Sequence, residues 1–572
     1  MPKIDVDQQM FNTLMQESYT NDVLEDLLPV AKAELDGFDS EQKIYKIELN
    51  DTNRPDLWST PGLVRQLASV RDQEIAQYDF FSTEEETIDS EGRALIVDAS
   101  AEQVRPFSIG FGVRGVVVDE KILLSLIQSQ EKLCHNFGQK RKTIAMGIYR
   151  SDLMTYPIHY KGADPDTTKF VPLHSDQEMS MREILTKHPK GVEFGHIVAD
   201  KPVFPLLYDD KGEVLSFPPV INSAYIGAVE EGDENLFIEF SGPILDDLLL
   251  AANIVACDCA DLGYEILPVK CQFPYETEYG TEVTVPYYFQ KPVACDLQFL
   301  RKTLGKDLSE EEISTALRKM GIHSVTDEKM VYITVPEYRN DFLHQIDIVE
   351  DVMIGHGMSL FEPELPHDST IGRLTDAEVF IREVKDLMVG LGFQEMMYNY
   401  LGSKKEYIDN MRVDGSEYIQ IANPMSENYE FVRPSIIPSL LESESVSAHA
   451  QYPHYIFEIG KVAFLDESDN SGTTTRNYLG FLGAASEIGF NQLNSYISTL
   501  FYFLHRSYTL APIVDPRFIE GRCGHILSAH EVVGVFGEIH PAVLDNWGIG
   551  MPTIACEIDL DVLREKGEYS KA

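Results

Sequence analysis

The sequence predicts a multidomain α+β protein, because of its length, its apolar content and the way its patterns change along the chain. At 572 residues it is several times longer than a usual domain of about 100 to 200 residues, so we expect three to five domains. Hydrophobic residues make up 44% of the chain, which is enough to fill packed cores and excludes wholesale disorder. Runs with helical and strand periodicity alternate, and polar stretches divide them into four segments.

The first segment, residues 1–85, is predicted to be an α/β domain. Its apolar spacing favours a helix over residues 8–35, interrupted near Pro29. The alternating residues 43–50 favour a strand with one buried face. The acidic stretch 82–92 shows no apolar periodicity and marks the boundary of this domain.

The second segment, residues 90–275, is predicted to be a mixed α/β domain. One helix is expected from Asp119 to Asn136, where isoleucines and leucines follow helical spacing. Strand-like runs surround it, at residues 93–99, 114–118, 142–149 and 235–240. A polar passage, residues 275–282, follows the domain.

The third segment, residues 287–363, is predicted to be a small winged-helix-like module. A short helix is expected over residues 296–304, and a second one after the capping box of Ser309 and Glu312. The strand-like run 329–336 and a further helix complete the pattern.

The last segment, residues 370–572, is predicted to be an α+β domain built on a mostly antiparallel sheet. A capping box at Thr375 and Glu378 begins a long helix that ends near Gly392. Strand-like runs then alternate with helical patterns, at residues 455–464, 477–485, 531–539 and 553–560.

Charge and cysteine content narrow the classes of function. Asp and Glu number 93 against 47 Lys and Arg, so the formal net charge is −46. So acidic a chain does not hold nucleic acid by bulk attraction, which depends on Lys and Arg. The chain has no long apolar run and no signal-peptide pattern at its start, so we expect a soluble, cytoplasmic protein with no membrane partner. The seven cysteines fit neither a disulfide framework nor a zinc site.

A cluster of carboxylates in the third segment gives the sharpest chemical signal. Asp347, Glu350 and Asp351 follow helical spacing, and Asp341 lies just upstream of them. Water, nearby Arg or Lys, or a hard cation such as Mg²⁺ would each relieve the repulsion between them. From the residues alone, a solvated acidic face is the better interpretation in so acidic a chain.

The remaining motifs give weaker signals. The basic residues 139–142 could touch phosphate, although a solvated loop is the better interpretation. The glycines of residues 107–115 match no dinucleotide fingerprint, and no Walker-type loop is present. His344 and His356 have no partner at zinc-ligand spacing, and His540 has no companion nucleophile.

Taken together, four parts of the chain resemble the beta subunits of phenylalanyl-tRNA synthetase of the archaeal and eukaryotic type. Asn53–Asp56 resembles the N-terminal domain of that family, and Tyr338–Asp351 is similar to its B5 module. The editing-type B3/B4 domain is matched by residues 161–173, 188–196, 217–223 and 235–242. The C-terminal domain is matched by residues 423–441, 456–464 and 535–549.

The resemblance implies a function and a set of partners. The chain would pair with a catalytic alpha chain, two of each, and the assembly would join phenylalanine to its tRNA through an aminoacyl-adenylate. ATP and phenylalanine would bind on the alpha chain. The C-terminal domain of this family is a class II synthetase-like core that has lost its active site. We therefore expect no catalytic residue for aminoacylation in this chain, and Arg433 is expected to be structural.

The resemblance also implies two sites. The B5 carboxylates of the family bind Mg²⁺ in a site shared with the alpha subunit, which reverses the preference for a solvated face. The matching positions are Asp341, Asp347, Glu350 and Asp351. The middle domain of related chains hydrolyses tRNA mischarged with tyrosine, and Asn222 and Glu239 match polar positions of its pocket. A hydrogen-bonding pocket can select tyrosine by its hydroxyl.

The editing-type domain departs from the family pattern in two places. Residues 241–244 read Ser-Gly-Pro-Ile where the family usually has Thr-Gly-Thr-Asp, and residues 224–235 lack the basic residue that relatives usually carry. Two alternatives to an editing-capable ligase subunit therefore stay open. One is a stand-alone aminoacyl-tRNA deacylase, and the other is a non-catalytic scaffold that keeps a degenerate pocket.

Overall fold

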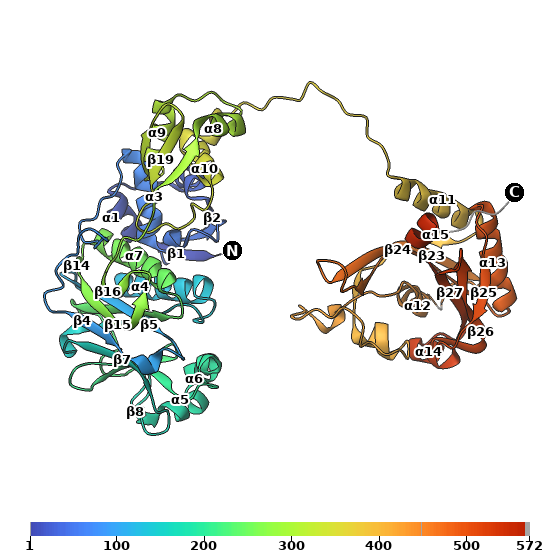
Figure 1. Cartoon of the computed structure of the whole chain (residues 1–572), viewed down its shortest axis with the longest axis horizontal. Coiled ribbons are helices and arrows are strands. Elements are labelled where there is room, and N and C mark those ends of the chain that lie inside the picture. The colour runs from blue at the N-terminus through green and yellow to red at the C-terminus, as the bar shows by residue number, and fades with distance from the viewer. Residues whose placement is uncertain (1, 448, 567–572) are drawn as a thin grey trace. The chain divides into compact units, whose positions relative to one another are not determined.

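The computed structural model describes residues 2–447 and 449–566, which belong to two compact units, residues 1–364 and 365–572 (Figure 1). Each unit contains both helices and sheets, so the expected mixed α/β multidomain architecture is confirmed. Within the described residues, no helix is long and apolar enough to cross a membrane.

The chain begins with a three-stranded antiparallel sheet in the order β1-β3-β2. Its strands are β1 (Lys3–Asp7), β2 (Ala33–Asp39) and β3 (Ile44–Leu49), and its helices are α1 (Gln8–Met15), α2 (Asn21–Leu27) and α3 (Thr60–Asp72). The expected helix over residues 8–35 is wrong. Gln16 and Lys32 take left-handed backbone conformations that end helical turns, and the residues after Lys32 pair with β3 instead.

Two sheets and four helices follow. The seven-stranded sheet contains β12 (Ile221–Asn222), β11 (Val214–Phe217), β10 (Phe204–Tyr208), β7 (Ile158–Ala163), β4 (Ala94–Val97), β15 (Val269–Thr277) and β16 (Gly280–Val285), in that order. The four-stranded sheet contains β14 (Glu265–Leu267), β5 (Phe107–Arg114), β13 (Leu236–Gly242) and β6 (Ala145–Arg150). A small hairpin joins β8 (Lys169–Phe170) to β9 (Met179–Ser180). The helices are α4 (Glu120–Lys132), α5 (Met181–Lys187), α6 (Pro189–Phe194) and α7 (Leu245–Asp261).

The strand expected at residues 114–118 is wrong. Strand β5 ends at Arg114, and Gly115 has φ +95°, which stops the extended pairing there. The strand is instead formed by the glycine-rich run that precedes Gly115. Helix α7 is buried along most of its length and lies against β5 and β13, so the four-stranded sheet is covered on that face.

The third segment forms a three-stranded sheet, β17 (Val293–Asp296), β19 (Met330–Thr334) and β18 (His323–Thr326), with helices α8 (Leu297–Leu304), α9 (Glu310–Lys319) and α10 (Gln345–His356). The expected capping box is present: Ser309 Oγ accepts from the amide of Glu312, and the Glu312 carboxylate accepts from the amide of Ser309. Gly305 ends α8 with φ +65°, as its position predicts.

The second unit is built on a seven-stranded sheet that is antiparallel except where β20 joins β23. Its strands in order are β20 (Gln394–Glu395), β23 (His454–Leu465), β24 (Thr473–Ala484), β28 (Thr553–Asp559), β27 (Glu531–Ile539), β26 (Phe518–Ser528) and β25 (Thr509–Pro512). A two-stranded ribbon pairs β21 (Leu401–Gly402) with β22 (Phe431–Val432). The helices are α11 (Asp376–Gly390), α12 (Ile437–Val446), α13 (Phe490–Phe503), α14 (Pro541–Trp547) and α15 (Leu560–Lys566).

The two helices α9 and α10 approach closely at Gly355, where a Cβ would lie 2.1 Å from the carbonyl oxygen of Ala316. We expect Gly355→Ala to push the helices apart and destabilise the module by about 1–3 kcal/mol. Faster amide hydrogen exchange in α9 and α10 would show this effect. As a control, Gly390→Ala at the end of α11 meets open space and should not speed exchange in α11. Equal exchange in the wild type and Gly355→Ala would contradict the prediction.

Candidate functional site

A cavity of about 140 Å³ brings together the two residues expected to form a pocket, Asn222 and Glu239. Asn222 comes from β12 at the edge of the seven-stranded sheet, and Glu239 comes from β13 in the middle of the four-stranded sheet. The cavity therefore lies where the two sheets face each other. Tyr149, Ser216 and Arg141 also line it.

Glycines make room for Glu239 on both sides. In the register of the sheet, Glu239 lies opposite Gly110 of β5 and opposite Gly147 of β6. Residues opposite one another share a face, so both glycines lie on the face of the sheet that carries Glu239. A Cβ on Gly110 would meet the Phe237 ring and the carbonyl oxygen of Ile238. A Cβ on Gly147 would lie 2.0 Å from the hydroxyl oxygen of Tyr149. The glycine-rich run of β5 thus serves the cavity and does not bind phosphate in the manner of a dinucleotide loop.

Two hydroxyl groups contact the buried carboxylate. Ser108 Oγ donates to Glu239 Oε1 at 2.9 Å, and the Tyr149 hydroxyl lies 3.5 Å from Oε2. The Tyr149 hydroxyl also donates to Ser216 Oγ at 2.7 Å, which connects the two sheets. Glu239 is 1% exposed, and burial raises its pKa to about 7 although Ser108 and Arg105 favour the ionised form. Glu239 can therefore exchange a proton near neutral pH.

Asn222 holds the edge of the cavity through its amide. Its Nδ2 lies 3.5 Å from the carbonyl oxygen of Ile148 and 3.4 Å from that of Gly227. Its side chain is half-buried, so the amide is held beside the cavity and is also accessible from it. These contacts leave Oδ1 as a possible acceptor for a bound molecule.

The basic residues 139–142 do not all behave as a solvated loop. Lys140 and Lys142 are exposed, but Arg141 lines the cavity and donates from Nη1 to the carbonyl oxygens of Pro219 and Val220, both at 3.1 Å. Its guanidinium also lies 4.1 Å from the centre of the Phe194 ring. The backbone takes consecutive positive φ angles at Gln139, Lys140 and Arg141. This energetically unfavourable conformation turns the Arg141 side chain inward. The interpretation of a solvated loop is therefore wrong for Arg141.

Arg141 and Lys190 supply positive charge that the segment 224–235 lacks. At the other departure from the family pattern, Ser241 is buried and its Oγ accepts from Arg105 Nε at 3.2 Å. Ser241 therefore supports the sheet beside Glu239. Neither departure removes the polar lining of the cavity.

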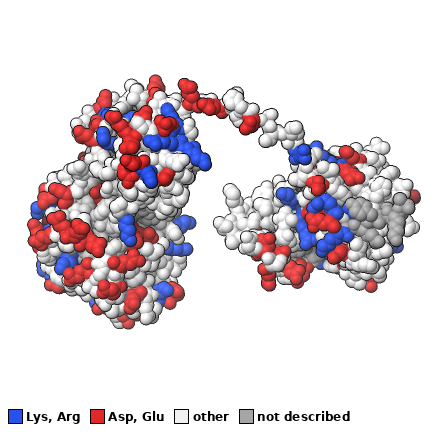
Figure 2. Space-filling view, turned by 45° about the horizontal axis from the view of Figure 1, so that its top comes forward, with Lys and Arg blue, Asp and Glu red and all other residues white. Residues whose placement is uncertain are grey.

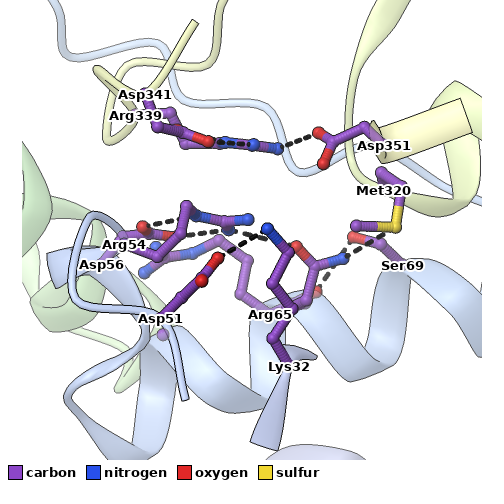
Figure 3. A network of polar contacts seen from close by, with 12 residues as sticks. Lys32, Asp51, Arg54, Asp56, Arg65, Ser69, Met320, Arg339, Asp341 and Asp351 are labelled. Carbon is purple, nitrogen blue, oxygen red and sulfur yellow. Dashed lines mark hydrogen bonds and ion pairs between the residues drawn. The ribbon is translucent and has the colours of Figure 1, made fainter. Parts of the chain in front are cut away.

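The four carboxylates of the third segment are placed differently from one another. Arg339 is 1% exposed and holds two of them (Figure 3). Its Nη2 lies 2.6 Å from Asp341 Oδ2, and its Nη1 lies 2.6 Å from Asp351 Oδ2. Burial opposes the ionisation of Asp341, but the ion pair with Arg339 outweighs it and lowers the pKa to about 2.

The other two carboxylates lie at the exposed side of α10. Asp347 Oδ2 accepts from the backbone amides of Leu343 and His344 at 2.8 and 2.6 Å and so caps the helix. Glu350 Oε2 forms an ion pair at 2.9 Å with Lys32, which also pairs with Asp51 (Figure 3). Within the described residues, no hydrogen bond or ion pair reaches Asp347 Oδ1 or Glu350 Oε1.

This arrangement fits part of a magnesium site and not a complete one. Among the described residues, no group of three or more His, Cys, Asp or Glu side chains could hold a metal ion. Asp341 and Asp351 are matched by Arg339, while Asp347 and Glu350 keep open oxygens three residues apart on one helix face. The chain by itself thus offers two hard ligands, and the remaining ligands would have to come from elsewhere.

The described cysteines are all free and buried, as expected from their scattered positions. Figure 2 shows Asp and Glu side chains spread over the visible face of the first unit, with Lys and Arg between them. On this face of the first unit the acidic residues are therefore spread out and not gathered in one patch.

Comparison with known proteins decides the family. A family model described as "Phenylalanyl tRNA synthetase beta chain CLM domain" matches residues 362–560, and one described as "tRNA synthetase B5 domain" matches residues 293–358. A phenylalanine–tRNA ligase beta subunit from Borreliella burgdorferi is 46% identical over 99% of this chain and 100% of its own length. The chain belongs to the phenylalanine–tRNA ligase beta subunit family. It is accordingly a subunit of an aminoacyl-tRNA ligase, as the resemblance implied.

Other members of the beta subunit family give the same result. The beta subunit from Borrelia turicatae is 45% identical over 98% of this chain and 100% of its own length. An N-terminal fragment of the beta subunit from Pyrococcus horikoshii superposes with a TM-score of 0.58 at 35% identity, over 62% of this chain and all of the fragment.

The raised pKa of Glu239 makes stability depend on pH. Below about pH 4.5 both the folded and unfolded states hold the proton, whereas up to about pH 7 only the folded state keeps it. The stability that the protonated group confers is therefore lost as the pH rises through this window. We expect Glu239→Gln to gain up to about 3 kcal/mol over the wild type between pH 4.5 and 8. The free energy of unfolding, measured for both proteins across this pH range, tests the prediction, with the exposed Glu231→Gln as control. A parallel change of stability with pH in Glu239→Gln and the wild type would contradict it.

Proposed function

We propose that this beta subunit works in a heterotetramer of two alpha and two beta chains. The alpha chain would bind ATP and phenylalanine and form the aminoacyl-adenylate, and the tRNA for phenylalanine would contact both chains in the cytoplasm. The family membership supports the division of labour, since the relatives carry the name of a subunit. In the second unit, Arg433 is fully buried against Glu458 at 2.8 Å, which supports a structural role.

The cavity around Glu239 is proposed to hydrolyse tRNA mischarged with tyrosine. The observation that carries this proposal is that Asn222 and Glu239, from different sheets, line one cavity with a buried carboxyl group whose pKa lies near 7. The ionised carboxylate would accept a hydrogen bond from the tyrosine hydroxyl. Phenylalanine lacks that hydroxyl and would leave a buried carboxylate without its partner, which disfavours binding.

The basic residues beside the cavity suit the substrate. Arg141 and Lys190 lie at the cavity, so a phosphate of the tRNA 3′ end would meet positive charge there. Because Arg141 is already anchored by two carbonyl oxygens, it is held in place before the substrate arrives.

The reconstituted enzyme tests the proposal. We expect charging of tRNA with phenylalanine only when this chain and the alpha chain are co-expressed. Glu239→Ala should lower deacylation of tyrosyl-tRNA by about tenfold or more without changing phenylalanine charging, because the hydroxyl loses its acceptor. The exposed Glu231→Ala should behave as wild type in both assays.

Each alternative has its own outcome in that experiment. Deacylation by this chain alone, without association with the alpha chain, would favour a stand-alone deacylase. A mixture that shows no gain in charging would favour a scaffold. Full deacylase activity in Glu239→Ala would contradict the role of this cavity.

For the metal, we propose that Asp341, Asp347, Glu350 and Asp351 form the beta side of a Mg²⁺ site shared with the alpha chain. The open oxygens of Asp347 and Glu350 support this proposal, and Asp341 and Asp351 fix Arg339 beside them. A bound Mg²⁺ would supply positive charge that joins carboxylates of two chains.

Substitution of the exposed carboxylates tests the metal proposal. Asp347→Asn keeps an oxygen that caps α10 but removes the charge. Glu350→Gln likewise removes a charge while keeping an oxygen, at the carboxylate that pairs with Lys32. We expect each to raise the Mg²⁺ concentration needed for assembly with the alpha chain by about tenfold, because a hard anionic ligand is lost. Size measurements at a series of Mg²⁺ concentrations provide the readout, with Glu311→Gln on α9 as control. An unchanged Mg²⁺ dependence would argue against the site.

A further inference from the structure

The second unit contains a cavity of about 520 Å³ that is separate from the candidate sites of the first unit. It opens on one face of the seven-stranded sheet. Aromatic and charged side chains line it together, among them Tyr418, Phe464, Tyr478, Arg517, Glu557 and Asp559. A volume of this size lies within the usual range of small-molecule sites, about 300–1,000 Å³.

The register of the sheet explains why polar groups gather there. His525 of β26 lies opposite Val535 of β27, and Val535 lies opposite Glu557 of β28. Asp559 follows Glu557 by two residues and lies opposite Tyr478 of β24. Opposite and alternate residues share a face, so the imidazole, both carboxylates and the phenol are presented to one side of the sheet.

The other face of the same strands is apolar. There the residues alternating with Tyr478, Glu557 and Asp559 are Leu479, Phe481, Cys556 and Ile558, each at most 1% exposed. Helix α12 partly covers the face of the sheet that carries the cavity. Apolar residues could therefore also have been accommodated on that face. Buried carboxylates on that face cost free energy, and packing of the sheet does not require them.

Among the charged side chains that line the cavity, carboxylates outnumber basic groups. Arg517 is matched by Asp515 at 2.7 Å. Glu557 is 4% exposed and accepts hydrogen bonds from the neutral Ser435 hydroxyl, at 2.9 Å, and from the backbone amide of Ile436. Asp559 is equally buried, and an ion pair with Arg476 at 2.9 Å matches its charge, whereas Glu557 has no salt-bridge partner of its own among the described residues. Asp414 adds a further carboxylate to the lining.

Two features show which kind of molecule would complete this cavity. The rings of Phe464 and Tyr478 lie 5.9 Å apart and offer aromatic faces next to Asp559, a combination that attracts organic cations. His525 Nδ1 is buried at the cavity and has no hydrogen-bond partner among the described residues. A buried nitrogen of this kind calls for a partner, and an ammonium group can donate to it.

Other ligands fit less well. Within the described residues no group of three or more acidic, histidine or cysteine side chains could hold a metal ion, so the acidic lining is not a metal site. An anion would meet several carboxylates and a guanidinium that already has its partner. We infer that this cavity binds a small organic amine, with its ammonium group between Glu557 and His525, which lie in one row of the sheet, and its apolar body against Phe464, Tyr478 and the neighbouring valines. This inference depends neither on editing nor on magnesium.

Three probes of one shape and different charge test the inference. They are 2-phenylethylamine, a cation at neutral pH; 2-phenylethanol, which is neutral; and phenylacetate, an anion. Binding to the full-length chain is followed by saturation-transfer NMR and calorimetry, without the alpha chain and its phenylalanine site. We expect the amine to bind about tenfold more tightly than the alcohol, and the acid not to bind at millimolar concentration.

Variants locate the binding. Val514 lines the cavity and is 84% exposed, so Val514→Trp can cover the opening with little risk to folding, and it should weaken amine binding by about tenfold or more. Val446→Trp, at a 69% exposed position of α12 outside the cavity, is the matched control and should bind as wild type. Glu557→Gln keeps an oxygen that can accept from the amide of Ile436 but removes the charge, and it should weaken binding of the amine selectively.

The inference would be overturned by absence of amine binding at millimolar concentration. Equal affinity for the amine and the alcohol would also overturn it, since the carboxylates would then play no part. Unchanged amine binding in Val514→Trp would show that the amine binds outside this cavity, and this result would also overturn the inference.

Discussion

The first unit depends on buried arginines that each need a carboxylate within reach. Arg65 of α3 pairs with Asp258 of α7 at 2.7 Å, and Arg339 pairs with Asp341 and Asp351 of the third segment. A buried guanidinium without its partner costs several kcal/mol, so Arg65 and Asp258 hold α7 against α3. Arg339 holds the third segment together from within, and the ion pair of Lys32 with Glu350 at 2.9 Å joins that segment to the N-terminal domain.

Because contacts of this kind join residues that are far apart in the chain, the sequence alone did not predict much of the site. Capping boxes, glycine stops and alternating strands are local signals, and they placed α9, α11 and the strands β23, β24, β27 and β28 correctly. The helix expected over residues 8–35 was wrong because Gln16 and Lys32 take left-handed backbone conformations that end helical turns, and the residues from Ala33 onward pair with β3 in a hairpin.

The residues of the candidate cavity also divide into those that were predicted from the sequence and those that were not. Asn222 and Glu239 were found by family resemblance, but Tyr149 and Arg141 were not. Tyr149 belongs to the site only because Gly147 lies opposite Glu239 and leaves space for its hydroxyl, and that register is a property of the folded sheet. Arg141 had a visible signal in the basic residues 139–142. The positive φ angles of residues 139–141 turn the Arg141 side chain toward the cavity, and the residue types do not predict those angles.

Buried carboxylates in this chain fall into two groups, and the difference indicates their roles. Asp258, Asp341 and Asp351 face guanidinium groups that neutralise them, so they are committed to holding segments together. Glu239 and Glu557 are as deeply buried, yet their hydrogen bonds come from hydroxyls and a backbone amide. Burial raises the pKa of both, so each can bind or release a proton when a ligand arrives. Glu239 and Glu557 also each line a cavity, which makes them accessible to a bound molecule.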